Sequence, residues 1–294
     1  MPAFFREPFT LDETTRAALP GQFVRLPDGV THYELSGPAE GQVVVLVHGF
    51  STPMFLWDPM VGPLREAGFR VLRYDLFGRG YSDRPAVRYD ADLFDRQLLH
   101  LLEALGLTDP VDVIGLSMGG LIGVTFTDRH PERVRRLGLL APAGFPTPVT
   151  FRVLALALPV LGDVLMKIAG DRLIIGGLPR DFYLLHRYPE YEARYQRQLP
   201  YRGFKRALLA TMRHMNFSAA EAYRRVGQQK RPVLLIWGEQ DITVPFAQHK
   251  QVLDAIPHAE FHAIPEAGHV AHYERPEAVN PLVIAFLKAP KSTS

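Results

Sequence analysis

The sequence predicts an α/β fold with a mostly parallel central sheet, helices on both of its faces and an inserted helical cap. Short apolar runs that suit buried strands alternate with longer segments whose apolar residues recur at helical spacing. The alternation lapses over 145–226, where helical segments rich in Leu, Tyr and Arg follow one another without a strand signal. Because 294 residues suit one large domain, we expect a single domain over 1–294 with a cap over 145–226.

Each element before the cap follows from apolar periodicity and from turn residues. Segments 22–26 and 30–35 flank Pro27-Asp28-Gly29 and are predicted to form an antiparallel hairpin. The further strands expected here are 43–47, 69–74, 111–114 and 136–140. Helices are expected over 10–16, 57–67 and 90–105, and from residue 121 onward. After the cap we expect strands at 232–237 and 259–264 and helices at 247–256 and 276–287.

Composition and charge exclude several classes of function. The formal net charge is +2 and the arginines are scattered, so no nucleic-acid partner is expected. The chain has no cysteine, which excludes disulfides, a thiol nucleophile and thiolate metal sites. The apolar stretch 149–169 is interrupted by Pro159, Gly162, Asp163 and Lys167, so stable membrane insertion is not expected. No signal peptide is recognised, and a cytoplasmic location is the expectation.

The run Val-Asp-Val-Ile-Gly-Leu-Ser-Met-Gly-Gly at 111–120 carries the strongest chemical signal. Apolar residues up to Ile114 suit a buried strand, and helical spacing resumes at Leu121. Between them, Gly115-Leu-Ser117-Met-Gly119 fits the G-x-S-x-G pattern of a tight strand-to-helix turn. Such a turn holds a serine hydroxyl clear of the sheet at a helix N-terminus, where peptide dipoles favour developing negative charge. We therefore predict that Ser117 is a nucleophile.

Two further polar residues follow predicted strands. Asp241 comes just after the strand 232–237, and His269 lies in the loop after the strand 259–264. Because the carboxyl ends of parallel strands meet at one edge of a sheet, we expect both side chains near Ser117. A histidine can take the serine proton, and a carboxylate can hold that imidazole in one tautomer. The sequence thus predicts a catalytic triad of Ser117, Asp241 and His269.

Other residues compete for these roles. His272 lies only three residues after His269 and is the main alternative for the base. Glu239 and Glu266 are the alternatives for the acid, and Glu266 is expected to face solvent.

A tetrahedral intermediate also needs backbone N–H groups aimed at its oxyanion. We expect one from Met118, the residue after the nucleophile, and one from Phe50 in the segment His48-Gly49-Phe50. His48 itself is interpreted as structural. Asp75 and Arg79, in the glycine-rich loop 75–83, are interpreted as a charged pair that braces that loop.

Taken together, these motifs resemble the α/β-hydrolase superfamily, and specifically its cap-bearing serine esterases and lipases. The resemblance covers about residues 22–288 and rests on His48-Gly49-Phe50, Asp75-Leu-Phe-Gly78-Arg79-Gly80-Tyr-Ser-Asp83, Gly115-Leu-Ser117-Met-Gly119-Gly120, Gly238-Glu-Gln-Asp241 and Gly268-His269. Haloalkane dehalogenases and epoxide hydrolases of this fold have an aspartate where this sequence has Ser117. The carbon–carbon bond hydrolases share Ser117-Met-Gly-Gly but usually have an asparagine where this sequence has Leu116, and their cap arginine is not identified here.

The resemblance implies a serine hydrolase that cleaves small-molecule carboxylic esters of short to medium acyl chain without a metal or organic cofactor. The alternatives are a carbon–carbon bond hydrolase of vinylogous diketones and a non-catalytic binding protein of the same fold. Apolar cap residues are expected to roof the pocket, among them Val153, Leu154, Leu156 and Leu158. The predicted pocket residues are Trp57, Phe145, Leu154, Leu156 and Val270.

Overall fold

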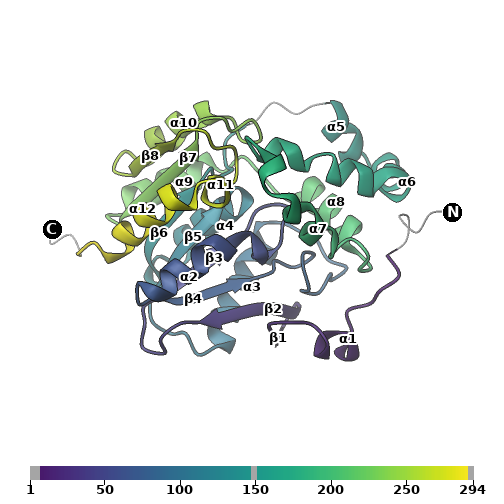
Figure 1. Ribbon diagram of the computed structural model, residues 1–294, viewed down its shortest axis with the longest axis horizontal. Coiled ribbons are helices and arrows are strands. Elements are labelled where there is room, and N and C mark those ends of the chain that lie inside the picture. The colour runs from purple at the N-terminus through teal and green to yellow at the C-terminus, as the bar shows by residue number, and fades with distance from the viewer. Residues whose placement is uncertain (1–6, 147–150, 291–294) are drawn as a thin grey trace.

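The computed structural model describes residues 7–146 and 151–290, without the side chains of residues 151–153. Within these residues one eight-stranded sheet has the order β1-β2-β4-β3-β5-β6-β7-β8 (Figure 1). The strands are β1 Gln22–Leu26, β2 Gly29–Ser36, β3 Val43–Val47, β4 Arg70–Tyr74, β5 Val111–Leu116, β6 Val134–Leu140, β7 Val233–Gly238 and β8 Glu260–Ile264. The β1–β2 hairpin is antiparallel and β2 runs antiparallel to β4, whereas all the other strand pairs are parallel. The predicted fold class is therefore confirmed.

Helices cover both faces of this sheet. On one face lie α3 Ala91–Ala104, α4 Met118–Arg129, α9 Ala220–Gln228 and α10 His249–Ala255. On the other lie α2 Asp58–Glu66 and α12 Pro276–Lys288, with the short α11 Ala271–Glu274 beside them. A short α1 Glu13–Ala17 precedes the hairpin.

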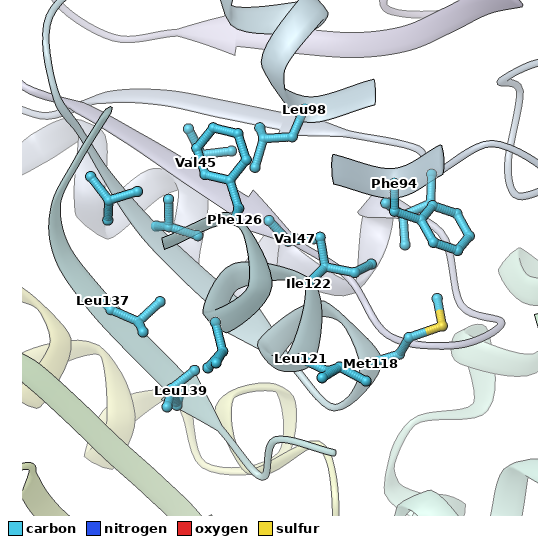
Figure 2. Packing of buried hydrophobic residues seen from close by; sticks show 14 of the residues in the cluster. Val45, Val47, Phe94, Leu98, Met118, Leu121, Ile122, Phe126, Leu137 and Leu139 are labelled. Atoms are coloured by element: carbon cyan, nitrogen blue, oxygen red, sulfur yellow. The ribbon is translucent and has the colours of Figure 1, made fainter. Parts of the chain in front are cut away.

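The central strands are apolar on both sides because both of their faces are buried. In β3, Val45 and Val47 join the core under α3 and α4, while Val44 and Leu46 join the core under α2 and α12. Figure 2 shows Leu121, Ile122 and Phe126 of α4 packed over this first face, close to strand residues such as Val47. Two packed layers thereby fix the end of β5, which carries the predicted nucleophile.

The segment between β6 and β7 forms the helices α5 Phe151–Ala157, α6 Leu161–Ile175, α7 Pro189–Gln196 and α8 Phe204–His214. They gather beside one end of the sheet, shown in teal and green in Figure 1. Helix α9, at the end of the predicted cap range, instead packs with α4 and α10 against the sheet. The extent of the cap stays a prediction.

Most predicted elements are present with bounds shifted by a few residues. Helix α4 begins at Met118 rather than Leu121, because the helix starts directly after the turn at Ser117. Helix α11 was not predicted, since four residues are too few to show a period. In the described ranges, no helix combines the length and apolar character needed to cross a bilayer.

Candidate active site

Ser117 sits in the tight turn that the sequence predicts. Its φ of 55° and ψ of −121° are a strained conformation for a residue with a side chain. The flanking glycines are required by close approach: a Cβ at Gly115 would lie 2.2 Å from the carbonyl oxygen of Gly119, and one at Gly119 would lie 2.1 Å from that of Val47. The strain is maintained by hydrogen bonds such as Ser117 N–H to the carbonyl of Leu140, at 3.0 Å.

Asp241 and His269 are brought together from the ends of β7 and β8. The Nδ1 atom of His269 is 2.8 Å from Oδ2 of Asp241. Three further donors reach this carboxylate: the indole Nε1 of Trp237 at 3.1 Å and the backbone N–H groups of Thr243 and Val244 at 2.8 and 3.0 Å. The aspartate therefore holds the imidazole with its Nε2 atom free for a proton from elsewhere.

The charge balance around His269 favours a base that is readily protonated. Burial opposes the imidazolium, but the neighbouring acids, above all the charge and hydrogen bond of Asp241, outweigh it and raise the pKa of His269. A proton accepted from a serine would thus be stabilised where it arrives.

The competing residues lie elsewhere. His272 is fully buried, its ring centroid lies 4.5 Å from that of Trp57, and burial lowers its pKa to about 3. Glu239 and Glu266 are exposed. Within the described chain, His269 is the histidine that lines the cavity next to Ser117.

A cavity of about 360 Å³ opens over Ser117 and His269. Its floor includes Phe50 and the buried Leu116. The cap contributes a largely apolar roof made by Leu156, Met166, Leu173, Ile174, Leu178 and Leu208. This volume is within the range of small-molecule sites.

Two of the five predicted pocket residues, Leu156 and Val270, line this cavity. Trp57 does not, because it is fully buried under His272 in the core. Phe145 packs on Tyr223 instead, with ring centroids 5.0 Å apart. Leu154 is 51% exposed on the outer face of the cap.

Two further residues, Leu158 and Val153, were predicted to roof the pocket. Leu158 is 54% exposed, so it faces solvent rather than the cavity. The side chain of Val153 lies outside the described residues.

Of the two predicted oxyanion donors, Phe50 lines the cavity, and Met118 directly follows Ser117, which also lines it. In the described chain, neither the Phe50 N–H nor the Met118 N–H donates to a backbone carbonyl, so both are available to a ligand. His48 orients the first of them. Leu76 N–H donates to its Nε2 at 2.9 Å, so Nδ1 carries the proton and donates to the carbonyl of Gly49 at 2.9 Å. That carbonyl belongs to the same peptide group as the Phe50 N–H, and burial lowers the pKa of His48 to about 4 and keeps it neutral.

Asp75 and Arg79 do not form the charged pair that the sequence suggests. Asp75 binds the ring of His32 at 2.6 Å and accepts from the N–H groups of Met54 and Tyr81. Arg79 instead donates through Nε to the carbonyl of Phe50 at 2.7 Å. Its guanidinium also donates to the carbonyl of Phe77 at 3.1 Å, so it links its own loop to the segment 48–50 that carries the predicted donor Phe50, called the oxyanion loop below.

Sequence reasoning missed five polar residues of the cavity wall, namely Ser51, Thr52, Arg180, Asp181 and Thr243. Arg180 and Asp181 end a 3₁₀ turn in the cap, and Thr243 lies two residues after Asp241. Neither cap residue stands at a strand end or in a motif, so only the folded chain reveals their position.

Comparison with known proteins agrees with this geometry. A model of the alpha/beta hydrolase family matches residues 44–282. A 2-hydroxy-6-oxononadienedioate/2-hydroxy-6-oxononatrienedioate hydrolase of Paraburkholderia xenovorans (strain LB400) is 30% identical over 285 residues, covering 90% of this chain and 94% of that protein. A 2-hydroxy-6-oxo-6-phenylhexa-2,4-dienoate hydrolase of Burkholderia cepacia is 28% identical over 86% of this chain and 90% of that protein. The solved enol-lactonase from Burkholderia xenovorans LB400 is 26% identical, with a TM-score of 0.80 over 91% of this chain and 100% of that one.

These relatives overturn the expectation of a carboxylic-ester hydrolase. Relatives that match nearly the whole chain are named as hydrolases of 2-hydroxy-6-oxo-dienoates, the class that the sequence left as its alternative. The presence of Leu116 in place of the usual asparagine had favoured esters. In the structure Leu116 is 2% exposed and forms part of the cavity floor, so its side chain marks an apolar wall rather than an ester-specific feature.

Proposed function

From the premise that this chain belongs to the alpha/beta hydrolase family and is a hydrolase, we propose that it cleaves a carbon–carbon bond in a 2-hydroxy-6-oxo-dienoate. The observation that carries the proposal is the series of relatives of this class, 27–30% identical over 86–95% of the chain. The substrate is a chain of conjugated carbons with a carboxylate at one end and a ketone at C6.

We assign the roles of the site residues within this proposal as follows. Ser117 attacks the C6 carbonyl, His269 takes its proton, and Asp241 holds the imidazole. The N–H groups of Phe50 and Met118 receive the oxyanion. In the keto form of the substrate, the C5–C6 bond can then break because its electron pair is delocalised through the C3=C4 bond to the 2-oxygen. The acyl group stays on Ser117 as an ester, and water that gives a proton to His269 hydrolyses this ester and releases the carboxylic acid.

The cavity suits both ends of such a molecule. Its apolar roof and Leu116 offer a wall to the conjugated chain and to a substituent on C6. Arg180 lines the same cavity, and its guanidinium donates a long hydrogen bond of 3.5 Å to the carbonyl of Ile242. A guanidinium without a carboxylate partner among the described residues is suited to bind the carboxylate of a dienoate.

The test is the loss of the dienoate absorbance on incubation with the purified enzyme. The wild type should consume a 6-phenyl dienoate and release benzoate and a hydroxypentadienoate. Arg180→Gln should raise KM roughly 10- to 100-fold, because a charge-assisted hydrogen bond contributes about 1.5–3 kcal/mol. Arg172→Gln, on the exposed side of α6, is the matched control and should keep the wild-type KM. Turnover of enol lactones or p-nitrophenyl esters with no cleavage of any dienoate would refute the proposal.

A further inference from the structure

A second carboxyl group lies in the wall of the active-site cavity. Asp181 lines it together with Ser117 and His269. Its Oδ1 atom is 2.8 Å from Oγ1 of Thr243, whose backbone N–H donates to Asp241. Thr243 therefore hydrogen-bonds to both acids, to Asp181 through its hydroxyl and to Asp241 through its backbone N–H.

The hydrogen bonds assign different forms to these two acids. Asp241 accepts from three N–H groups besides His269, whereas Asp181 has one partner, the Thr243 hydroxyl. That hydroxyl also lies 3.0 Å from the carbonyl of Arg180, and it has a single proton to give. A protonated Asp181 that donates to Thr243, which in turn donates to the carbonyl, satisfies both contacts with full hydrogen bonds. Paired acids held in different protonation states are a mark of acid–base assignment.

The neighbouring groups shift the pKa of Asp181 in the direction that this assignment requires. Burial raises its pKa and the Asp241 carboxylate adds to this, while the charge of His269 and the Thr243 hydrogen bond oppose it. The charged and titratable groups around it are Arg180, Tyr191, Tyr195, Asp241 and His269.

We infer that Asp181 is the acid that protonates the 2-oxygen of the leaving fragment, which rests on the proposed function. Because Arg180 and Asp181 line the same cavity, we place the substrate carboxylate at Arg180 and the adjacent 2-oxygen at Asp181. When the C5–C6 bond breaks, its electron pair runs to that oxygen. The O–H bond of Asp181 breaks and a new O–H bond forms there, so the fragment leaves as an enol. The Asp181 carboxylate then regains a proton from water.

Asp181→Asn tests the inference, because the amide can still donate to Thr243 but cannot give up a proton. For dienoate cleavage kcat should fall about 10²–10³-fold, in the range of general acid catalysis. In stopped-flow absorbance the keto form of the substrate should accumulate, since cleavage slows while ketonisation does not need this acid. The bell-shaped pH profile of the wild type should become a single rise through the pKa of His269. Asp181→Glu should recover part of kcat.

The controls separate this inference from the function it rests on. Asp171→Asn removes a cap carboxylate that pairs with Lys205 at 2.8 Å outside the cavity, and it should keep the wild-type profile. Labelling of Ser117 by a fluorophosphonate, which releases no carbon fragment, should slow far less than cleavage in Asp181→Asn. An unchanged kcat and an unchanged bell-shaped pH profile in Asp181→Asn would overturn the role of Asp181 and leave the proposed function standing. A wild type that cleaves no dienoate would overturn the proposed function and this inference with it.

Discussion

Replacement of Arg79 by methionine probes whether a buried guanidinium holds the oxyanion loop in place. Arg79 is fully buried, donates to the carbonyls of Phe50 and Phe77 at 2.7 and 3.1 Å, and lies 5.3 Å from the ring centroid of Phe50. Burial lowers its pKa to about 10, so it remains charged at neutral pH. Methionine fills much of the space but leaves the Phe50 carbonyl without its donor.

The size of the effect follows from that one bond. A hydrogen bond to a charged group contributes about 1.5–3 kcal/mol. If 2–3 kcal/mol of it is expressed in the transition state, kcat falls roughly 30- to 150-fold. KM should change little, because the oxyanion forms only after substrate has bound. Steady-state kinetics on the dienoate substrate, with the melting temperature measured in parallel, gives both values.

Arg84→Met is the matched control for this prediction. Arg84 also donates to backbone carbonyls of the glycine-rich loop, those of Ser82 and Gly80 at 2.8 and 2.7 Å, but it does not contact Phe50. A general loosening of the loop should lower the melting temperature in both variants. Only Arg79→Met should lose kcat. Equal kcat values in the two variants would refute the idea that Arg79 acts through the oxyanion loop.

Three further predictions concern the triad and its turn. Ser117→Ala should lower kcat by about 10⁴-fold or more while the circular dichroism spectrum and melting temperature stay near those of the wild type; retained turnover would exclude Ser117 as the nucleophile. Because the pKa of His269 is raised above its ordinary 6.5, activity should be lost as pH falls through that higher value, and Asp241→Asn, which cannot stabilise the imidazolium, should lower kcat by up to about 10⁴-fold across the pH range. Gly119→Ala should abolish folding or activity, because its Cβ would meet a β3 carbonyl at 2.1 Å, whereas Gly62→Ala in α2 has open space and should gain roughly 0.5–1 kcal/mol in urea unfolding; a stable, active Gly119→Ala enzyme would show that the turn tolerates a side chain.

The core of this fold could be predicted from sequence because its signals are local. A buried strand such as Val43–Val47 is apolar at every position, and Gly115 and Gly119 bracket a turn that only small residues permit. Strand order is different: β4 lies between β2 and β3, a non-local pairing that no short pattern encodes. The alternation of strands and helices predicts a parallel sheet whose strands all end at one edge. It does not predict which strands are neighbours.

The cap shows where sequence patterns stop being informative. Leu154 and Leu156 lie in α5 and Leu158 directly follows it, yet only Leu156 reaches the cavity while the other two are about half exposed. Which side of a cap helix faces the site depends on α6 and α8, with which α5 packs. Arg180 and Asp181 were equally hidden, since their importance comes from the cavity beside them and not from their neighbours in sequence.

Glu274 couples the part of the cap that carries Arg180 and Asp181 to the loop that carries His269. Its buried carboxylate accepts from the N–H groups of Tyr183 and Leu184 in the cap, at 2.9 and 3.0 Å, and from Gly268, the residue before His269, at 2.7 Å. The two segments also approach so closely that a Cβ on Gly268 would lie 2.7 Å from the Tyr183 nitrogen. The proposed substrate anchor, the proposed acid and the base are thus tied to one carboxylate. Any movement of the cap that admits substrate without displacing the base must therefore pivot elsewhere than at this carboxylate.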